Sequence, residues 1–203
     1  TSPWPSSTPR ARRRERALNR PVPPRDRLGP PIRSETIHEG VIVNLRRSEY
    51  RRPDGTVVTR EVMDHPGAVV MVPVEGDRVL MVRQPREAVE EYTLELPAGK
   101  LDHAGEPPLE CARRELAEEV GRSAATWRDL GGFYTAPAIL TEFIHCFLAT
   151  DLTRVADAPR ADEDEAIEVV EWPLADLDRA IDGSRDAKTL IGLLRLQRGL
   201  RAR

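Results

Sequence analysis

Residues 95–123 read ELPAGKLDHAGEPPLECARRELAEEVGRS and combine a glycine-containing turn with a strongly acidic helical segment. Pro107 and Pro108 suit the first turn of a helix, where no amide donor is needed, and Gly121 suits its C-terminal stop. The pattern therefore predicts a helix over residues 107–121. Four apolar residues fall within about 80° of its circumference and mark the buried side. They are Leu109, Ala112, Leu116 and Val120.

Carboxylates gather beside this apolar stripe. Glu115 and Glu119 lie one helical turn apart at its edge, and Glu118 is within reach of the same point. Like charges at such spacings repel by about a few tenths of a kcal/mol. A hard divalent cation removes the conflict, and ligands that are all oxygen favour Mg²⁺ or Mn²⁺ over zinc. The alternative is a solvated acidic face balanced by Arg113 and Arg114.

The composition limits the classes of protein that fit. A chain of 203 residues suits one domain with appendages. Charged residues make up 32% and apolar residues 39%, and no apolar run approaches the roughly 20 residues that cross a bilayer, so no membrane association is expected. Two cysteines, Cys111 and Cys146, are too few for a disulfide framework. A reducing cytoplasm is therefore the expected location.

The net charge of −3 is unevenly distributed. Residues 1–33 contain nine Arg against Glu15 and Asp26, a balance of +7, which leaves −10 for residues 34–203. This first segment also holds eight of the eighteen prolines and too few apolar residues for a core, so it is predicted to be a disordered tail. Such a tail could touch nucleic acid or an acidic surface, or be a solvated extension. The acidic remainder makes general binding to nucleic acid unexpected.

Strand patterns lie on both sides of the acidic helix. Strands are predicted over residues 37–45, 56–63, 67–74, 78–84, 92–99, 128–135, 142–150 and 166–172. Turn residues join the first two strands into one hairpin and the next two into another. Helices are predicted over 173–181 and 186–197. This order favours a mixed α+β sandwich over a doubly wound parallel sheet.

Gly99, Glu106 and the sequence RELAEEVG at 114–121 together resemble the Nudix box, the signature of the Nudix hydrolases. The gap between Gly99 and Glu106 is one residue longer than usual, and Arg122 stands where an aliphatic residue is expected. Neither departure touches the REL-x-EE core. Further segments resemble the ADP-ribose pyrophosphatase branch of this family. They are residues 60–70, 82–86 and 94–99, together with Pro137.

This resemblance implies a fold and a domain organisation. The fold would be a Nudix-type α/β/α sandwich with a mixed β-sheet, plus an N-terminal antiparallel sheet. Residues 34–66 would form a β hairpin region that takes part in dimerisation, and residues 67–203 would form the Nudix hydrolase domain. Members of this branch are typically homodimers, so a homodimer is expected.

The resemblance also implies roles for individual residues. Metal ligands would be Glu115, Glu118, Glu119, the carbonyl of Ala98 and Glu106, the last of which would either assist or pair with Arg114. Substrate contacts would come from Arg86, Gly99 and Arg60. Glu142 would be a catalytic glutamate on a loop in which Ala138 replaces the usual glycine.

The activity implied by the resemblance is metal-dependent hydrolysis, with Mg²⁺ or Mn²⁺, of the diphosphate of ADP-ribose or a related ADP-sugar. The products would be AMP and a sugar phosphate. Two alternatives stay open. One is a Nudix hydrolase of another nucleoside diphosphate sugar or of a dinucleotide, and the other is a protein that senses ADP-ribose without cleaving it. The intact REL-x-EE residues count against the sensor.

Overall fold

A computed structural model describes residues 29–156 and 166–202, and it divides the chain into two compact units. The first unit comprises Thr1–His65 and Ala136–Glu142, and the second comprises Pro66–Thr135 and Phe143–Arg203. Most of the predicted disordered tail, residues 1–28, lies outside the described residues. Among the helices of the described part, none is long and apolar enough to cross a membrane.

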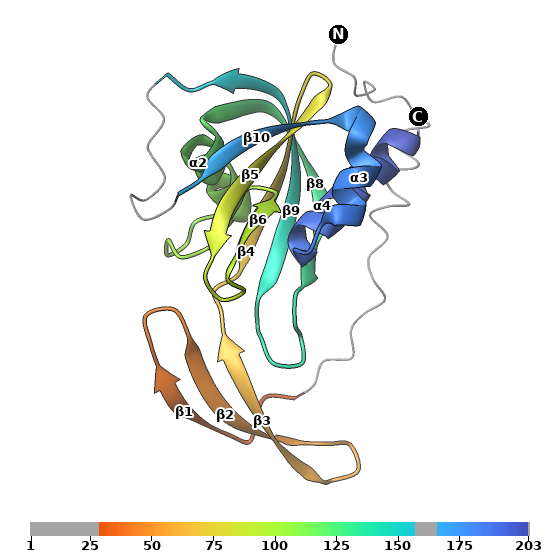
Figure 1. Ribbon diagram of the computed structural model, residues 1–203. Helices are drawn as coiled ribbons and strands as arrows, with labels where there is room; N and C mark the ends of the chain where they lie inside the picture. Colours follow the sequence, from red (N-terminus) through yellow and green to blue (C-terminus); the bar gives the residue numbers. More distant parts are fainter. Residues whose placement is uncertain (1–28, 157–165, 203) are drawn as a thin grey trace. The chain divides into compact units, whose positions relative to one another are not determined.

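The first unit contains a three-stranded antiparallel sheet in the order β1-β2-β3 (Figure 1). Its strands are β1 (Arg33–Glu39), β2 (Asn44–Arg51) and β3 (Val57–Asp64). The predicted turn at residues 53–55 joins β2 to β3, as expected. The single strand predicted over 37–45 is wrong, because the chain reverses there and the Gly40 amide donates to the Val43 carbonyl at 3.1 Å. The turn contains Val41, Ile42 and Val43, which have the composition typical of a strand.

Residues 136–142 complete the first unit, although they are distant from β3 in the sequence. The Met63 amide donates to the Ile139 carbonyl at 2.7 Å, and the Thr141 amide donates to the Met63 carbonyl at 3.0 Å. The Thr141 hydroxyl also accepts a hydrogen bond from the His65 amide at 2.8 Å. The unit is therefore assembled from two separate stretches of chain.

The second unit is built on a seven-stranded mixed sheet in the order β10-β5-β4-β9-β8, with β6 paired to β5 and β7 paired to β4. Strands β4 and β9 are parallel, whereas the other pairs are antiparallel. The strands are β4 (Ala68–Glu75), β5 (Arg78–Arg86), β6 (Glu91–Glu95), β7 (Ala98–Lys100), β8 (Arg122–Tyr134), β9 (Phe143–Arg154) and β10 (Glu168–Pro173). The α+β class and mixed sheet agree with the prediction.

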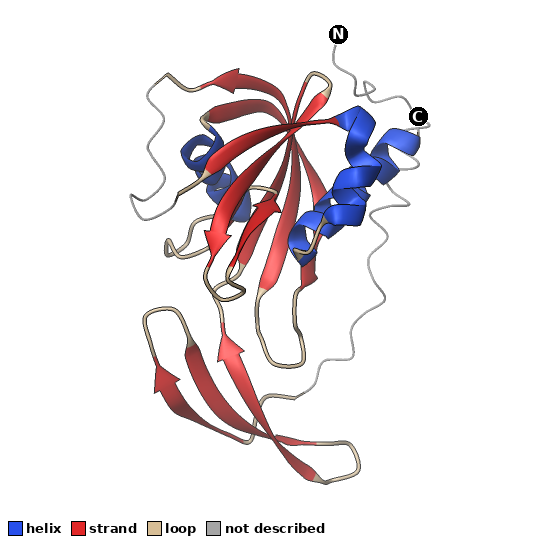
Figure 2. Ribbon diagram, in the orientation of Figure 1, coloured by secondary structure: helices blue, strands red, loops and turns tan. Residues whose placement is uncertain are grey.

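Helices cover both faces of this sheet (Figure 2). They are α2 (Pro108–Val120), the 3-10 turn η1 (Leu174–Asp176), α3 (Leu177–Gly183) and α4 (Ala187–Arg201). Val69 and Met71 of β4 pack in one core with Leu116 of α2. Val72, which points to the opposite face, lies against Gly192 of α4. Because β4 is buried on both faces, it has a continuous apolar sequence instead of an alternating one.

The ends of α2 agree with the helix predicted over 107–121. Its C-cap is Gly121, whose φ of 65° is left-handed and whose amide donates to the Ala117 carbonyl at 3.0 Å. Strand β8 begins at the next residue, six residues earlier than the strand predicted from 128. The small residues at 123–125 gave little strand signal there.

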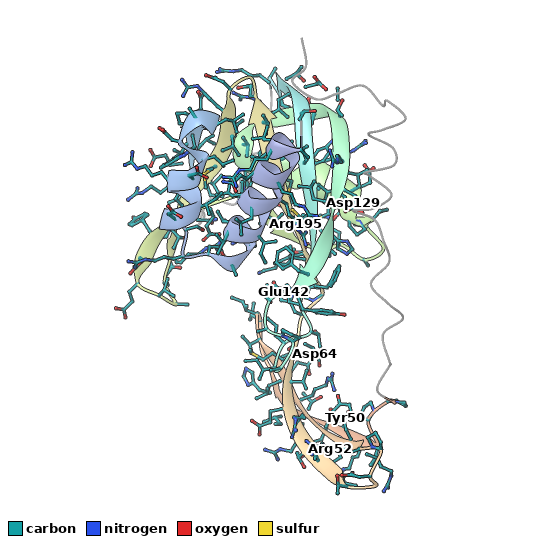
Figure 3. The ribbon with its side chains drawn as sticks, turned by 90° about the vertical axis from the view of Figure 1, so that its right-hand side faces the viewer. Tyr50, Arg52, Asp64, Asp129, Glu142 and Arg195 are labelled. Atoms are coloured by element: carbon teal, nitrogen blue, oxygen red, sulfur yellow. The ribbon has the colours of Figure 1, made fainter. Side chains whose placement is uncertain are left out.

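A register irregularity interrupts β8 between Asp129 and Gly132. The Gly131 amide donates to the Asp129 carboxylate at 2.6 Å, and Arg195 of α4 donates to the Gly131 carbonyl at 2.9 Å. Figure 3 shows the Asp129 and Arg195 side chains at this part of the second unit. The irregular segment therefore ties β8 to α4.

Candidate active site

The acidic residues of α2 form a cluster around one guanidinium group, here called the Arg114 cluster (Arg114, Glu106, Glu115 and Glu118). Arg114 donates through Nε and Nη2 to the two carboxylate oxygens of Glu106, each at 3.1 Å. Its Nη1 donates to Glu115 at 2.8 Å and to Glu118 at 2.9 Å. Of the two roles expected for Glu106, pairing with Arg114 is the one that this arrangement shows. Three carboxylates thus share one cation, and the formal charge of the cluster is −2.

Glu115 is the most deeply placed carboxylate of the cluster. Burial raises the pKa of Glu115, and the neighbouring charge of Glu118 adds to the rise, while Arg114 opposes it. The backbone of Gly99 lies directly on this side chain, since a Cβ at position 99 would come within 2.0 Å of the Glu115 carboxyl carbon. Gly99 was expected to contact substrate. The structure shows a further reason for glycine at this position, which is that the missing side chain leaves room for Glu115.

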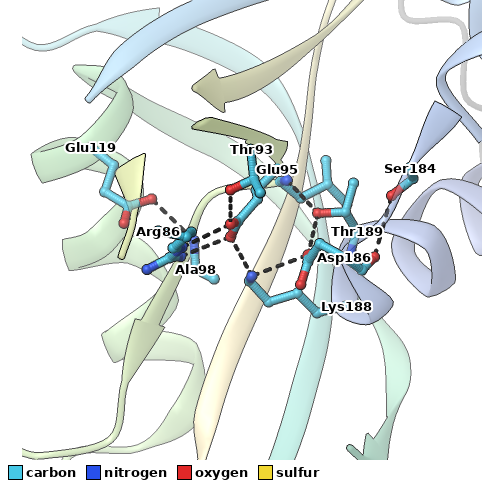
Figure 4. A network of polar contacts seen from close by, with 10 residues as sticks. Arg86, Thr93, Glu95, Ala98, Glu119, Ser184, Asp186, Lys188 and Thr189 are labelled. Atoms are coloured by element: carbon cyan, nitrogen blue, oxygen red, sulfur yellow. Dashed lines mark hydrogen bonds and ion pairs between the residues drawn. The ribbon is translucent and has the colours of Figure 1, made fainter. Parts of the chain in front are cut away.

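Glu119 points to the start of β7, the short strand that precedes the turn. Its carboxylate accepts a hydrogen bond from the Ala98 amide at 3.0 Å (Figure 4). Ala98 and Gly99 belong to β7, which is paired with β4, so the sheet fixes the backbone that meets the acidic helix. The structure therefore brings six predicted site residues together. They are Ala98, Gly99, Glu106, Glu115, Glu118 and Glu119.

The sequence suggested that these carboxylates reach a common point where a metal ion could bind. In the structure their side chains do not converge on one point. Within residues 29–156 and 166–202, no three His, Cys, Asp or Glu side chains are arranged to hold one metal ion. Glu115 and Glu118 turn to Arg114, whereas Glu119 turns to the Ala98 amide. The donor set is nevertheless suited to a hard cation, because it consists of carboxylate oxygens and already surrounds one positive group.

Arg86, which was predicted to contact phosphate, lies at the end of β5 and is paired with a buried carboxylate. Its Nε and Nη2 donate to the two carboxylate oxygens of Glu95, each at 2.8 Å (Figure 4). The charges of Glu95, Asp186 and Glu119 all raise the pKa of Arg86, with the hydrogen bonds to Glu95 contributing most. Arg86 therefore lies within the electrostatic reach of the acidic helix.

Sequence reasoning missed Glu95 and its second cation, Lys188 of α4. We call the group the Glu95 cluster (Glu95, Arg86, Thr93 and Lys188). Its members are separated by up to 102 positions, so no local pattern joins them. One signal was available. Glu95 is a single charged residue between Leu94 and Leu96, in a strand that enters the core.

The last two predicted site residues, Arg60 and Glu142, belong to the first unit. Arg60 is exposed on β3 and donates to the adjacent Thr59 carbonyl at 2.7 Å. Glu142 lies 3.5 Å from the Nε2 atom of His65, and the two form an ion pair when His65 is protonated. Figure 3 shows where Glu142 lies in the loop. The contact with His65 is a further feature that the sequence did not indicate.

A layered mixed sheet with an acidic helix packed on its central strand is the architecture that the resemblance to the Nudix hydrolases implied. The NUDIX domain family model matches residues 63–191, which is more than half of the chain. The chain therefore belongs to the Nudix family and is a Nudix hydrolase.

Several named relatives are similar to this chain over most of its length. An ADP-ribose pyrophosphatase of Mycobacterium tuberculosis (strain ATCC 25618 / H37Rv) is 45% identical over 152 residues, 74% of this chain and 73% of that protein. An ADP-ribose pyrophosphatase of Bacillus subtilis (strain 168) is 37% identical over 169 residues, 82% of this chain and 91% of that protein. A GDP-mannose pyrophosphatase of Cronobacter sakazakii (strain ATCC BAA-894) is 36% identical over 185 residues, 82% of this chain and 93% of that protein.

The fold is also similar to that of a solved structure. The crystal structure of an ADP compounds hydrolase superimposes with a TM-score of 0.75 at 25% identity, and the match covers 88% of this chain and 98% of that chain. The match supports the Nudix-type α/β/α sandwich and the separate N-terminal sheet predicted from the sequence.

Proposed function

We propose that this protein hydrolyses the diphosphate of ADP-ribose or a related ADP-sugar, releasing AMP and a sugar phosphate. The observation that carries the proposal is the surplus negative charge of the Arg114 cluster beside the backbone of Ala98 and Gly99. A site with this charge is stabilised by a further cation, and a diphosphate brings anionic oxygens that the same cation can share. The names of two relatives, both ADP-ribose pyrophosphatases, support the choice of substrate.

The activity would depend on a divalent cation, which we propose to be Mg²⁺ or Mn²⁺. The residues that would hold it are Glu115, Glu118, Glu119, Glu106 and the carbonyl of Ala98. Bound there, the cation would supply charge neutralisation on the diphosphate and a lower pKa for the attacking water. Nudix hydrolases in general need divalent metal, and the oxygen-only donor set fits Mg²⁺ and Mn²⁺ better than zinc.

Other residues would bind the substrate and handle the proton. Arg86 would contact a phosphate, because a guanidinium forms strong paired hydrogen bonds to such groups. Gly99 and Arg60 are further proposed contacts. Glu142 would help to activate or position water, and its contact with His65 would hold the carboxylate in its loop.

One alternative substrate class has a specific observation in its favour. The Cronobacter relative, 36% identical over most of both chains, is named a GDP-mannose pyrophosphatase. The same acidic helix would serve a guanine nucleotide, since the hydrolysed diphosphate is common to both substrates. A dinucleotide substrate and a non-catalytic sensor are weaker alternatives, because nothing in the described site favours them.

A panel of nucleotides tests the proposal. The protein is incubated with Mg²⁺ and, separately, ADP-ribose, ADP-glucose, GDP-mannose and a diadenosine polyphosphate, and the products are separated by chromatography. We expect the fastest turnover with ADP-ribose, giving AMP and ribose 5-phosphate. A faster GDP-mannose reaction would move the proposal to that class. Tight binding of ADP-ribose without turnover in Mg²⁺ or Mn²⁺ would favour the sensor.

We also propose that the protein is a homodimer formed through the N-terminal hairpin region, residues 34–66. A small sheet without an apolar face against a core is marginally stable alone. Here every residue of β1 is exposed, and three apolar side chains at the β1-β2 turn, Val41, Ile42 and Val43, are exposed as well. Light scattering of the full chain measures the oligomeric state.

A reducing cytoplasm is the proposed location, in keeping with the buried free thiols Cys111 and Cys146.

A further inference from the structure

The carboxylate of Glu95 is buried, with only 3% of its side chain exposed, yet its oxygens are surrounded by donors. Arg86 approaches from one side, and the Thr93 hydroxyl donates to Oε1 at 2.5 Å. The ammonium of Lys188 donates to Oε2 (Figure 4). Burial alone would raise the pKa of Glu95, but these partners outweigh burial and lower it to about 2. The group is therefore a fixed anion.

The bidentate contact fixes the orientation of Arg86. A guanidinium carries five N–H donors in one plane, and Glu95 engages only the Nε and Nη2 edge. All side-chain hydrogen bonds of Arg86 within the described part of the chain go to Glu95. The side chain is 43% exposed, and its remaining N–H donors, on Nη1 and the second position of Nη2, make no hydrogen bond to the described residues. An arginine held in this way presents a defined edge to an anion.

The other side of Glu95 is anchored to helix α4. Lys188 also lies 3.1 Å from the Asp186 carboxylate, which accepts from the Thr189 amide at 2.9 Å. The Thr189 hydroxyl in turn accepts from the Leu96 amide at 2.8 Å. Figure 4 shows this chain of contacts between the end of β6 and the start of α4. Because each member has its partner, the arrangement is rigid.

Lys188 is an unusual choice in this chain, where 29 of the 31 basic residues are Arg. An ammonium is a compact charge with three donors, and it can bridge two carboxylates that do not lie in one plane. Lys188 bridges Glu95 and Asp186 in this way. Together with Arg86, the four charges sum to zero, so this group has no surplus charge of its own.

We propose that Glu95 is a positioning residue, which holds the guanidinium of Arg86 so that its outer edge faces the diphosphate of the substrate, and that Thr93 and Lys188 hold Glu95 in turn. The proposal rests on the proposed function, in which Arg86 contacts that diphosphate. A positioning role and a purely electrostatic role predict opposite changes in anion binding when Glu95 is removed. If Glu95 acted only as a charge, its removal would strengthen the binding of an anion, whereas loss of a positioning group weakens it.

Binding of ADP to the full chain in the presence of Mg²⁺, measured by calorimetry, tests the proposal. Glu95→Asp keeps the charge but withdraws the carboxylate by one methylene, and Glu95→Gln removes the charge. We expect each to weaken ADP binding by about tenfold, the scale of one charge-assisted hydrogen bond. In an Arg86→Ala background the same substitutions are expected to change the dissociation constant by less than about twofold, since contacts in one network are not additive.

The matched control is Glu91→Gln. Glu91 is on the same strand and pairs with Arg185, just before α4, at 3.1 Å, but both side chains are exposed. We expect its ADP binding to equal that of the wild type. Thermal unfolding of every variant identifies losses due to misfolding, and Glu95→Asp is the variant that retains the buried anion.

The outcomes separate this proposal from the proposed function. Tighter ADP binding by Glu95→Gln, or equal losses with and without Arg86, would overturn the positioning role, as would a wild-type protein that does not bind ADP. If the wild type hydrolyses none of the nucleotides in the panel, but ADP binding depends on Glu95 only when Arg86 is present, the enzymatic proposal fails and the positioning role stands.

Discussion

The Arg114 cluster and the Glu95 cluster use the same kinds of side chain in opposite proportions. In the Arg114 cluster, one cation lies among three carboxylates, and each of these carboxylates is partly exposed. In the Glu95 cluster, one buried carboxylate lies among two cations, and Asp186 balances the second of these. One group therefore has a surplus charge of −2, whereas the other is neutral with Asp186 included.

This difference in net charge suits the Arg114 cluster to bind a ligand and the Glu95 cluster to hold another side chain in position. A surplus of negative charge at the surface is stabilised when a further cation arrives, so the Arg114 cluster is suited to take up a ligand. A neutral, fully hydrogen-bonded group in a buried place gains nothing from a further ion, but it resists displacement. The four predictions below test this contrast.

The largest effect is expected from the acidic helix. Glu119→Gln and Glu115→Gln each remove one of the charges that would hold the cation, and turnover of ADP-ribose should fall by about a hundredfold or more. The control is Glu110→Gln on the same helix, where Glu110 is exposed and lies 3.8 Å from Arg113. Steady-state kinetics and circular dichroism measure the effect. Near-normal rates in both active-site variants would refute the assignment.

The second prediction concerns acid stability. The pKa of Glu95 is lowered from 4.5 to about 2 in the folded protein, so the unfolded state binds its proton first as the pH falls. The stability that Glu95 contributes is complete above pH 4.5 or so and is lost as the pH falls toward about 2, with an upper limit of about 3 kcal/mol. Urea unfolding across this range should be less dependent on pH in Glu95→Gln than in the wild type. Parallel curves would contradict the assignment.

The third prediction removes the cation from the Arg114 cluster. Arg114→Met leaves Glu106, Glu115 and Glu118 facing one another, and we expect a loss of about 1–2 kcal/mol in metal-free buffer after solvent screening. Because a divalent cation can take the place of the guanidinium, Mg²⁺ should restore more stability to the variant than to the wild type. Thermal unfolding with and without Mg²⁺ measures both. If Mg²⁺ stabilised the variant and the wild type equally, the proposed difference between the two clusters would be wrong.

The smallest effect is expected outside both clusters. Arg122, which stands where an aliphatic residue is usual, donates to Glu75 through Nε at 2.9 Å and through Nη2 at 3.2 Å. This contact lowers the pKa of Glu75 and ties the start of β8 to the end of β4. Arg122→Leu should lower the free energy of unfolding by about 1 kcal/mol or less and leave turnover unchanged. A larger loss would show that this ion pair is as important as the two clusters.

The sequence predicted those parts of the fold that local pattern determines. The helix over 107–121 was bounded by Pro107 and Gly121, and the structure places its ends within one residue of these limits. The turn at 53–55 was correctly found from its Pro-Asp-Gly residues. The turn at 40–43 was missed because Val41 to Val43 have the composition of a strand.

The candidate site was predictable to the same extent. The acidic helix and the glycine that meets it are close in sequence, and both came from one stretch. The partners of Arg86 were not predictable, because Glu95 and Lys188 reach it only through the pairing of β5 with β6 and the docking of α4. The inward turn of Glu115 toward Arg114 depends likewise on side-chain conformations that spacing does not determine.

The assembly of the first unit from two stretches of chain has a practical consequence. A truncated protein that starts at Pro66 would keep residues 136–142 but lose Met63, whose amide and carbonyl are hydrogen-bonded to Ile139 and Thr141. The backbone groups left without partners, beside the exposed side chain of Ile139, would form an adhesive edge. Such a fragment should aggregate on purification unless residues 136–142 are replaced by a short polar linker.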